Sequence, residues 1–306
     1  MHKFIVMNNT NYVIGIGELL WDCFPTFRRM GGAPANFAFH AAQFGHNAML
    51  ISALGNDEDG EQLTKELKNH NLSHNIAKIN LPTGVVNIDT SVPNDPKYTI
   101  ETDVAWSAIP YTEELAQIAE NCCAVCFGTL AQYGDISRET IKQFLAATPP
   151  DCYKIYDINL RSNSGINYFN NDIIKSSIAQ CNVLKVNIDE LNYLCNLFNI
   201  CIKKDDNIKH LGQELLEKLN NIKILIITMG TDGSWILTDT ISSYQDTPKV
   251  KVKDVVGAGD SFTGAFIGSI LNGKTIEDAH RIAVNVSAYV CEQPDGMPEI
   301  PEKLKK

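Results

Sequence analysis

The feature that most constrains this chain is an alternation of short apolar runs with amphipathic stretches. The runs are rich in β-branched residues, which is typical of strands buried on both faces. The predicted strands are Val13–Ile16, Ala48–Ser52, Ala124–Phe127, Lys154–Ile158, Val183–Val186 and Ile224–Thr228. The stretches between them carry apolar residues at helical spacing, as in Phe37, Ala38, Ala41 and Phe44. This alternation predicts an α/β fold in which a mostly parallel sheet lies between two layers of helices.

Two segments depart from this alternation, at about residues 18–30 and about residues 84–105. Both show extended, period-two patterns, and the second has a turn signal around Pro93–Pro96. We interpret them as a hairpin-rich insertion, either a small β-lid over a site at the carboxyl edge of the sheet or a solvent-facing structural flap. The chain shows no internal repeat or low-complexity linker, so we expect a single domain over residues 1–306.

The chain is acidic, with 26 Lys and Arg against 36 Asp and Glu and a formal charge of −10. Nucleic acids and anionic membranes select clustered basic residues, so we expect neither as a partner. No apolar run approaches the roughly 18 residues of a membrane-spanning helix. The first residues lack the basic, apolar and small-residue order of a signal peptide, so a cytoplasmic protein is expected.

The nine cysteines are scattered without the spacing of a disulfide framework, which favours reduced thiols. Cys122, Cys123 and Cys126 include a C-x-x-C, which suggests either a redox or metal pair or small buried side chains. The second interpretation is favoured, because these residues lead into or lie in an apolar run and no second pair follows at zinc-site spacing.

The segment Asp254-Val-Val-Gly-Ala-Gly-Asp260 precedes an apolar stripe at helical spacing, so we expect a helix to begin near Gly259. Gly257, Ala258 and Gly259 are small enough for backbone N–H groups to converge at that helix start, which predicts an anion hole. The carboxylate of Asp260 could accept a hydroxyl proton while the amides hold a transferring phosphoryl group. A Gly-x-Gly before a helix often means tight packing alone, but the flanking acidic residues favour a site.

The segment Gly31-Gly-Ala-Pro-Ala-Asn36 is a second candidate. Its paired glycines allow close backbone approach, Pro34 suits a first helical turn, and Asn36 offers both a donor and an acceptor. Such neutral groups suit a polyol ligand. Taken alone, the segment is better explained by an ordinary loop-to-helix junction.

Together the two segments resemble the two signatures of the ribokinase-like (PfkB) carbohydrate kinase family. Gly17-Glu-Leu-Leu-Trp-Asp22, Tyr98–Trp106 and Cys291–Pro298 resemble the fructokinase branch of that family. The matches run in family order from about residue 13 to residue 298, nearly the whole chain. The resemblance implies a ribokinase-like three-layer α/β/α sandwich with a mostly parallel sheet and a small β-lid. It also implies a kinase that uses ATP and Mg²⁺.

The resemblance assigns roles to the two signatures. It implies that Asp260 is the catalytic base and that Gly257, Ala258 and Gly259 form the anion hole around the γ-phosphoryl group. The residues that it implies for binding sugar hydroxyls are Asp22, Gly31, Gly32 and Asn36.

Asp157-Ile-Asn-Leu-Arg161 matches a further family element, and period two puts its three polar side chains on one side of the chain. Asn159 and Arg161 could therefore reach the sugar or the transferring phosphate, with a structural pair of Asp157 and Arg161 as the alternative. The family commonly has proline shortly after this arginine, whereas Ser162 and Asn163 follow it here.

Two cation sites are implied by the resemblance. Asn187 and Glu190 match an N-x-x-E element that organises Mg²⁺ through water, with an acidic first helical turn as the structural alternative. Asp254 matches a position that helps to bind a monovalent cation in relatives. The usual threonine at the next position is Val255 here, which leaves potassium activation open.

The nucleotide site is implied by Thr228, Gly230 and Gly233, which resemble the nucleotide-binding turn of the family and also fit a plain turn between strands. Asn285 falls where the family lines the adenine pocket, within an otherwise buried helical pattern. Trp106 could contact substrate or close the lid, although packing at the base of the lid is favoured.

We therefore expect an ATP-dependent sugar kinase, a fructokinase that phosphorylates a fructose hydroxyl, O6. Ribose, a keto-deoxy sugar acid or a nucleoside is the alternative acceptor, and a non-catalytic sugar-binding relative is the alternative of another class. Gly15-Ile-Gly17 suggests a dinucleotide-binding oxidoreductase, but Leu20 stands where the third glycine would be. Relatives often dimerise through the lid, so a homodimer is a further expectation.

Overall fold

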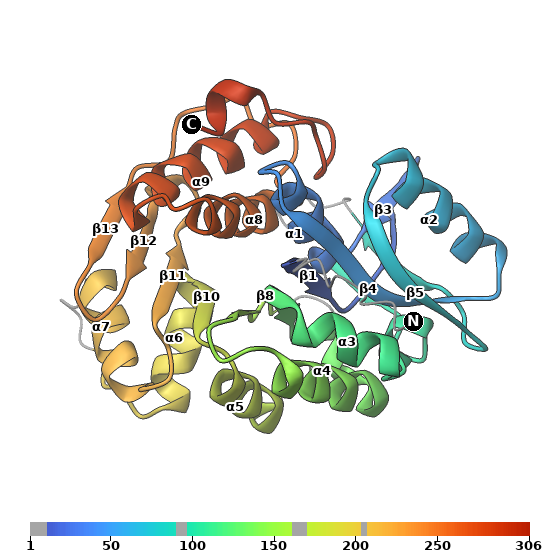
Figure 1. Cartoon of the computed structure of the whole chain (residues 1–306). Coiled ribbons are helices and arrows are strands. Elements are labelled where there is room, and N and C mark those ends of the chain that lie inside the picture. The colour runs from blue at the N-terminus through green and yellow to red at the C-terminus, as the bar shows by residue number, and fades with distance from the viewer. Residues whose placement is uncertain (1–10, 90–96, 161–169, 203–206) are drawn as a thin grey trace, which may run out of the picture.

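The computed structural model describes residues 11–89, 97–160, 170–202 and 207–306. Within them, the larger sheet has nine strands in the order β13-β12-β11-β10-β9-β8-β1-β4-β5 (Figure 1). Seven neighbouring strands pair in parallel, and β12 and β13 extend one edge by antiparallel pairing, β12 with β11 and β13 with β12. The bounds are β1 Tyr12–Ile16, β4 Asn47–Gly55, β5 Ser73–Ile79, β8 Cys122–Gly128, β9 Tyr153–Asp157, β10 Val183–Asn187, β11 Ile224–Thr228, β12 Ser234–Leu237 and β13 Ser242–Gln245. The mostly parallel sheet expected from the sequence is confirmed.

Helices cover both faces of this sheet, which gives three layers (Figure 1). One layer holds α1 Ala33–Ala42, α2 Glu58–Asn69, α8 Ala258–Leu271 and α9 Ile276–Cys291. The other holds α3 Glu113–Glu120, α4 Asp135–Ala147, α5 Asn171–Gln180, α6 Ile188–Leu197 and α7 Ile208–Lys218. Short 3₁₀ turns span Ala105–Ala108, Leu130–Tyr133, Gly230–Asp232 and Glu302–Leu304. Strand β1 illustrates the packing, because Val13 joins one hydrophobic core while Ile14 and Ile16 join the other.

Helices α1 and α8 pack unusually closely. A Cβ on Gly264 of α8 would lie 2.8 Å from the Cβ of His40 and 2.9 Å from the carbonyl oxygen of Phe37. Only a glycine leaves room for this approach. The contact brings the N-terminal turns of the two helices together, and these turns carry both sequence signatures.

A second sheet forms the β-lid, with the strand order β3-β2-β6-β7. Its strands are β2 Leu20–Cys23, β3 Arg28–Gly31, β6 Gly84–Asp89 and β7 Lys97–Ile100. They come from the two segments that depart from the α/β alternation, and the turn predicted around Pro93–Pro96 lies outside the described residues. Trp106 is fully buried beneath the lid, and a Cβ on Gly84 would lie 2.3 Å from its Nε1. Packing at the base of the lid is therefore its role.

The cysteine cluster belongs to the core. Cys122, Cys123 and Cys126 lie in β8, and their thiols are free. Within the described ranges, no group of three or more His, Cys, Asp or Glu side chains could hold a metal ion. No helix in that part of the chain is long and apolar enough to cross a membrane.

Candidate active site

Polar side chains gather where the parallel strands of the large sheet end. Thr228 ends β11, Asn187 ends β10 and Asp157 ends β9. The carboxyl ends of parallel strands lie at one edge of a sheet, where ligands of open α/β sheets bind. Two cavities lie at this edge, a large one of about 550 Å³ lined by Thr228 and a small one of about 10 Å³ lined by Asp157.

The first turn of α8 borders both cavities, with Gly259 in the lining of the large one and Asp260 in that of the small one. Gly257 precedes the helix with a φ of 76°, and a Cβ there would lie 2.8 Å from the Cα of Gly296. No side chain of the described residues caps this helix. Its first N–H groups and the positive end of its dipole therefore suit an anion.

Asp260 is held by the other signature. The side-chain Nδ2 of Asn36, in the first turn of α1, donates a hydrogen bond to Oδ2 of Asp260 at 2.7 Å. Asn159 lines the same small cavity and has a φ of 47°, a left-handed conformation that asparagine adopts more readily than most residues. Three of the predicted site residues thus lie together, although they are far apart in sequence.

Asp22 reaches this region from the lid. It lies in β2, and a Cβ on Gly31 would lie 2.4 Å from its Oδ2, so the carboxylate lies against the loop that leads to α1. Gly32 is the N-cap of α1 and has a φ of 127°. The lid therefore carries an acidic group to the Gly31–Gly32 loop, next to the small cavity.

Lys185 is a site residue that the motifs do not reveal. It lies directly opposite Asp157 in the β9–β10 ladder, and its Nζ donates to Oδ2 of Asp157 at 2.7 Å. Both side chains are more than nine-tenths buried. Burial opposes the charge of Lys185, but Asp157, Glu190 and Asp260 together raise its pKa, so the ammonium stays charged.

The ammonium of Lys185 lies beside the Gly-Ala-Gly turn. A Cβ on Gly259 would lie 3.1 Å from its Nζ. A buried cation thus lies close to the proposed anion hole, where it can attract phosphate oxygens. The sequence signal for this residue is a lysine inside the apolar strand Val183–Asn187.

Asn187 and Glu190 form a capping box at the start of α6. Oδ1 of Asn187 accepts the N–H of Glu190 at 2.9 Å, and Oε2 of Glu190 accepts the N–H of Asn187 at 2.8 Å. The other oxygen, Oε1, accepts the N–H of Leu160 at 2.8 Å. Burial raises the pKa of Glu190, and the charge of Asp157 adds to the effect. Since both carboxylate oxygens already hold amides, these residues fit Mg²⁺ through water better than by direct coordination.

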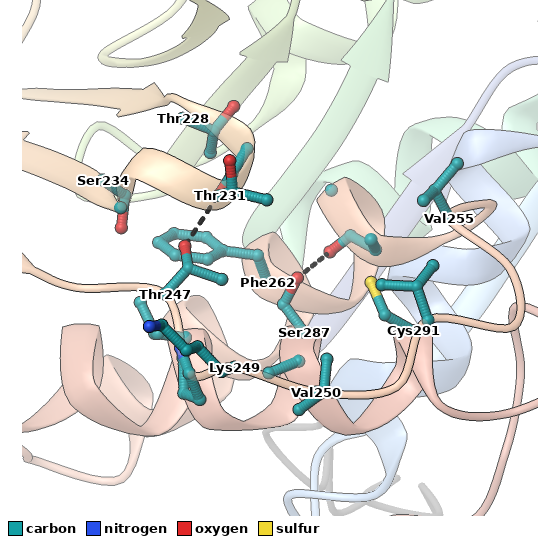
Figure 2. A pocket seen from close by; sticks show the side chains of 18 residues that line it. Thr228, Thr231, Ser234, Thr247, Lys249, Val250, Val255, Phe262, Ser287 and Cys291 are labelled. Atoms are coloured by element: carbon teal, nitrogen blue, oxygen red, sulfur yellow. Dashed lines mark hydrogen bonds between the residues drawn. The ribbon is translucent and has the colours of Figure 1, made fainter. Parts of the chain in front are cut away.

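The large cavity is lined mostly by apolar groups and backbone (Figure 2). Thr228, Gly230 and Gly233 form one wall, and both glycines have positive φ values, of 59° and 95°. Oγ1 of Thr247 donates to the carbonyl oxygen of Gly230 at 2.7 Å, which fixes this turn. The ring of Phe262 lies among these side chains, between Thr231 and Thr247 in the view of Figure 2.

Helix α9 forms the opposite wall of the large cavity. The α9 residues in that wall are Val284, Ser287, Ala288 and Cys291. They recur at helical spacing on one face of α9, and Asn285 is not among the described residues that line the cavity. Oγ of Ser287 donates to the carbonyl oxygen of Ala258 at 2.9 Å, which ties this wall to the start of α8 (Figure 2).

Two further predicted residues have different outcomes. Asp254 precedes the Gly-Ala-Gly turn, and its carboxylate forms an ion pair with Arg29 of the lid. Arg161 lies outside the described residues.

Comparison with known proteins agrees with this geometry. The profile of the pfkB family carbohydrate kinases matches residues 17–303. The chain belongs to this PfkB family. Its PfkB domain thus includes the lid, both cavities and the first turn of α8, and the family resemblance expected from the motifs is confirmed.

Relatives of this PfkB kinase act on different acceptors. The ATP-dependent 6-phosphofructokinase of Thermoanaerobacterium thermosaccharolyticum is 25% identical over 97% of this chain and 94% of its own length. Fructokinase-1 of Oryza sativa is 21% identical over 96% of this chain and 95% of its own. The 2-dehydro-3-deoxygluconokinase of Thermotoga maritima has the same fold, with a TM-score of 0.84, 19% identity and coverage of 96% of this chain and 98% of that one. The carbohydrate kinase class is therefore shown, and the acceptor is a separate question.

Proposed function

We propose that this protein is an ATP-dependent fructokinase that transfers the γ-phosphoryl group to O6 of fructose. The single observation that carries the proposal is the position of Asp260. It lies in the first turn of α8, between a large cavity suited to a nucleotide and a small cavity that Asp157 and Asn159 also border, and Asn36 holds its carboxylate at 2.7 Å.

The proposed catalysis depends on positioning and electrostatics, as phosphoryl transfer requires. Asp260 accepts the proton of the sugar hydroxyl, and Asn36 orients its carboxylate. The turn of Gly257, Ala258 and Gly259 receives the γ-phosphoryl group in this proposal, although the N–H of Ala258 donates to the carbonyl oxygen of Val255 at 3.3 Å in the structure. The ammonium of Lys185 adds positive charge beside this turn. Asn159 and Arg161 complete the acceptor side in this proposal.

The nucleotide occupies the large cavity in this proposal, with its phosphates toward α8. Thr228, Gly230 and Gly233 approach the ribose and phosphates, and Ala288 and Cys291 of α9 contact the base. Mg²⁺, held through water at Asn187 and Glu190, would supply charge neutralisation at the phosphates.

The described residues on the acceptor side suit the hydroxyls of a sugar. Lys185 and Arg29 each pair with a carboxylate, Asp157 and Asp254 respectively. Asp22, Asn36 and Asn159 offer groups that bind hydroxyls. Fructose is the neutral acceptor that the fructokinase-like Trp21-Asp22 pair favours.

We also propose that residues 1–306 work as one kinase domain and that the lid forms a homodimer interface. Strands β3 and β7 are the edges of the lid sheet, and unpaired edges are commonly covered by a second chain. Light scattering of the purified protein tests this, since a monomeric mass at micromolar concentration would exclude the dimer.

A coupled ADP-release assay across a sugar panel, with and without Mg²⁺, tests the function. We expect ADP release with fructose, dependence on Mg²⁺, and fructose 6-phosphate as the product in a ³¹P NMR spectrum. Preference for ribose, a keto-deoxy sugar acid or a nucleoside would select the alternative acceptor. If none of the sugars elicits ADP release and the protein still binds fructose, the result would support the non-catalytic relative.

A further inference from the structure

Arg29 joins three segments that are far apart in sequence. It belongs to β3 of the lid, and its Nη1 donates to Oδ2 of Asp254 and to the carbonyl oxygen of Pro294, the latter at 3.1 Å. The side chains of Arg29 and Asp254 are 12% and 22% exposed, so solvent screens this pair only weakly. The guanidinium also lies 4.8 Å from the ring centroid of Phe24.

These contacts occupy the atoms that a monovalent cation at Asp254 would need. Oδ1 of Asp254 accepts the N–H of Val256 at 2.9 Å, and Oδ2 accepts from Arg29. The carbonyl oxygen of Pro294 accepts from the same guanidinium at 3.1 Å. A second cation would also be repelled by the fixed positive charge of Arg29. The residues present therefore do not fit a potassium ion at Asp254.

We propose that Arg29 is the built-in cation of the loop before α8, and that this kinase consequently needs no monovalent cation. The inference rests on the proposed kinase function. Backbone N–H groups of Lys253 and Asp254 donate to the carbonyl oxygen of Cys291 at 2.8 and 3.3 Å, so the loop is tied to the end of α9. Arg29 holds the carboxylate of Asp254 from the lid side and so keeps the adjoining amides of the anion hole oriented.

The same contact couples the lid to the anion hole. Arg29 lies directly opposite Asp22 in the β2–β3 ladder, and Asp22 is the proposed sugar contact of the lid. Within the described residues, Nε and Nη2 of Arg29 have no hydrogen-bond partner, so Asp254 and Pro294 provide the polar contacts that fix the guanidinium. A sugar that fixes the position of Asp22 therefore also keeps Arg29 against Asp254.

The test measures sugar-dependent ADP release in KCl, NaCl and tetramethylammonium chloride at equal ionic strength. We expect wild-type rates to agree within about twofold. Arg29→Met keeps an apolar stem against Phe24 but removes the charge. Its kcat should fall about tenfold in tetramethylammonium chloride, and K⁺ or guanidinium should restore it about fivefold. Arg29→Lys keeps a positive charge and should show no response to the salt.

Arg28→Met is the matched control, because Arg28 is the neighbouring lid arginine but pairs with Asp59 instead. It should show no cation response. Activation of the wild-type enzyme fivefold or more by K⁺, or failure of K⁺ and guanidinium to act on Arg29→Met, would overturn the proposal. Melting temperatures in the same salts test the role of Arg29 separately from the proposed function. If no sugar is phosphorylated, the function fails, yet a K⁺-specific stabilisation of Arg29→Met and not of wild type would still support the role of Arg29.

Discussion

The two cavities beside α8 differ in how they are built. The large cavity, of about 550 Å³, is walled mainly by backbone and by apolar side chains such as Phe262 and Ala288. The small cavity, of about 10 Å³, has apolar walls such as Phe37 and Phe127, and the polar side chains of Asp157, Asn159 and Asp260 border it. The first offers surface to a large ligand, whereas the second offers a few groups in fixed positions.

This difference predicts where each kind of mutation acts. A ligand bound by backbone and apolar surface loses affinity gradually when one side chain changes. A reacting hydroxyl beside a carboxylate depends on single atoms, and removal of one of them affects the chemical step. Mutations on the acceptor side should therefore change kcat, and mutations in the large cavity should change the KM for ATP.

The largest effect is expected for Asp260→Asn. The amide keeps the size of the side chain but cannot accept the hydroxyl proton, so kcat should fall by roughly 10²- to 10⁴-fold. ATP affinity, measured by calorimetry, should stay within about twofold, because the nucleotide surface is intact. A variant that retains near wild-type turnover would refute Asp260 as the base.

Lys185→Met is expected to have the next largest effect, because it leaves Asp157 buried without its partner. Removal of one member of a buried ion pair costs about 3–5 kcal/mol in the free energy of unfolding, which urea denaturation measures. The double variant Lys185→Met/Asp157→Asn should recover most of this stability. It should not recover kcat if the ammonium acts on the phosphoryl group, whereas recovery of both would assign Lys185 a structural role alone.

Ala288→Leu tests the large cavity. Ala288 is buried in the wall of the large cavity, and a leucine there would crowd the bound nucleotide. An overpacking cost of about 1.4 kcal/mol would raise the KM for ATP about tenfold with little change in kcat. Asn285→Ala is the comparison on the same helix, and we expect it to leave this KM within about twofold. A larger rise of this KM in Asn285→Ala would support an adenine site beside Asn285, as the family resemblance implies.

The strands at the centre of the sheet could be predicted from the sequence because they are buried on both faces. Strands β5 and β13 could not. β5 contains Ser73, His74 and Asn75 and is partly exposed, and β13 begins with two serines at the edge of the sheet. An edge strand needs little apolar surface, so its sequence lacks the continuous apolar run that identifies the central strands.

The predictable part of the site is local in sequence. Asp260 and the glycines before it share one helix start, and Asn36 lies in a similar start of α1. The roles of Lys185 and Arg29 could not be predicted from local motifs, because their partners are 28 and 225 residues away in the sequence. Only the register of β9 with β10, and the placement of the lid over the loop before α8, bring these charges together.

A smaller effect, on the pH dependence of stability, is expected from two buried histidines. One lies in α1, beside the small cavity, and the other in α9, which walls the large cavity. Nε2 of His40 in α1 donates to the carbonyl oxygen of Gly296, and His280 in α9 bonds Ser234 and Ser243. Burial lowers the pKa of each histidine to about 4. The unfolded chain has a histidine pKa near 6.5, so it binds more protons than the folded state between about pH 6.5 and 4.

Stability should therefore be complete above about pH 6.5 and decline as the pH falls toward 4. Each histidine should cost about 1.4 kcal/mol of the free energy of unfolding between pH 7.5 and pH 5.5, measured by urea denaturation at each pH. His40→Gln and His280→Gln should each flatten this dependence by about half. If His40→Gln alone flattens it, the acid sensitivity belongs to the α1 side that holds Asn36. An unchanged slope in both variants would show that burial does not lower the pKa of either histidine.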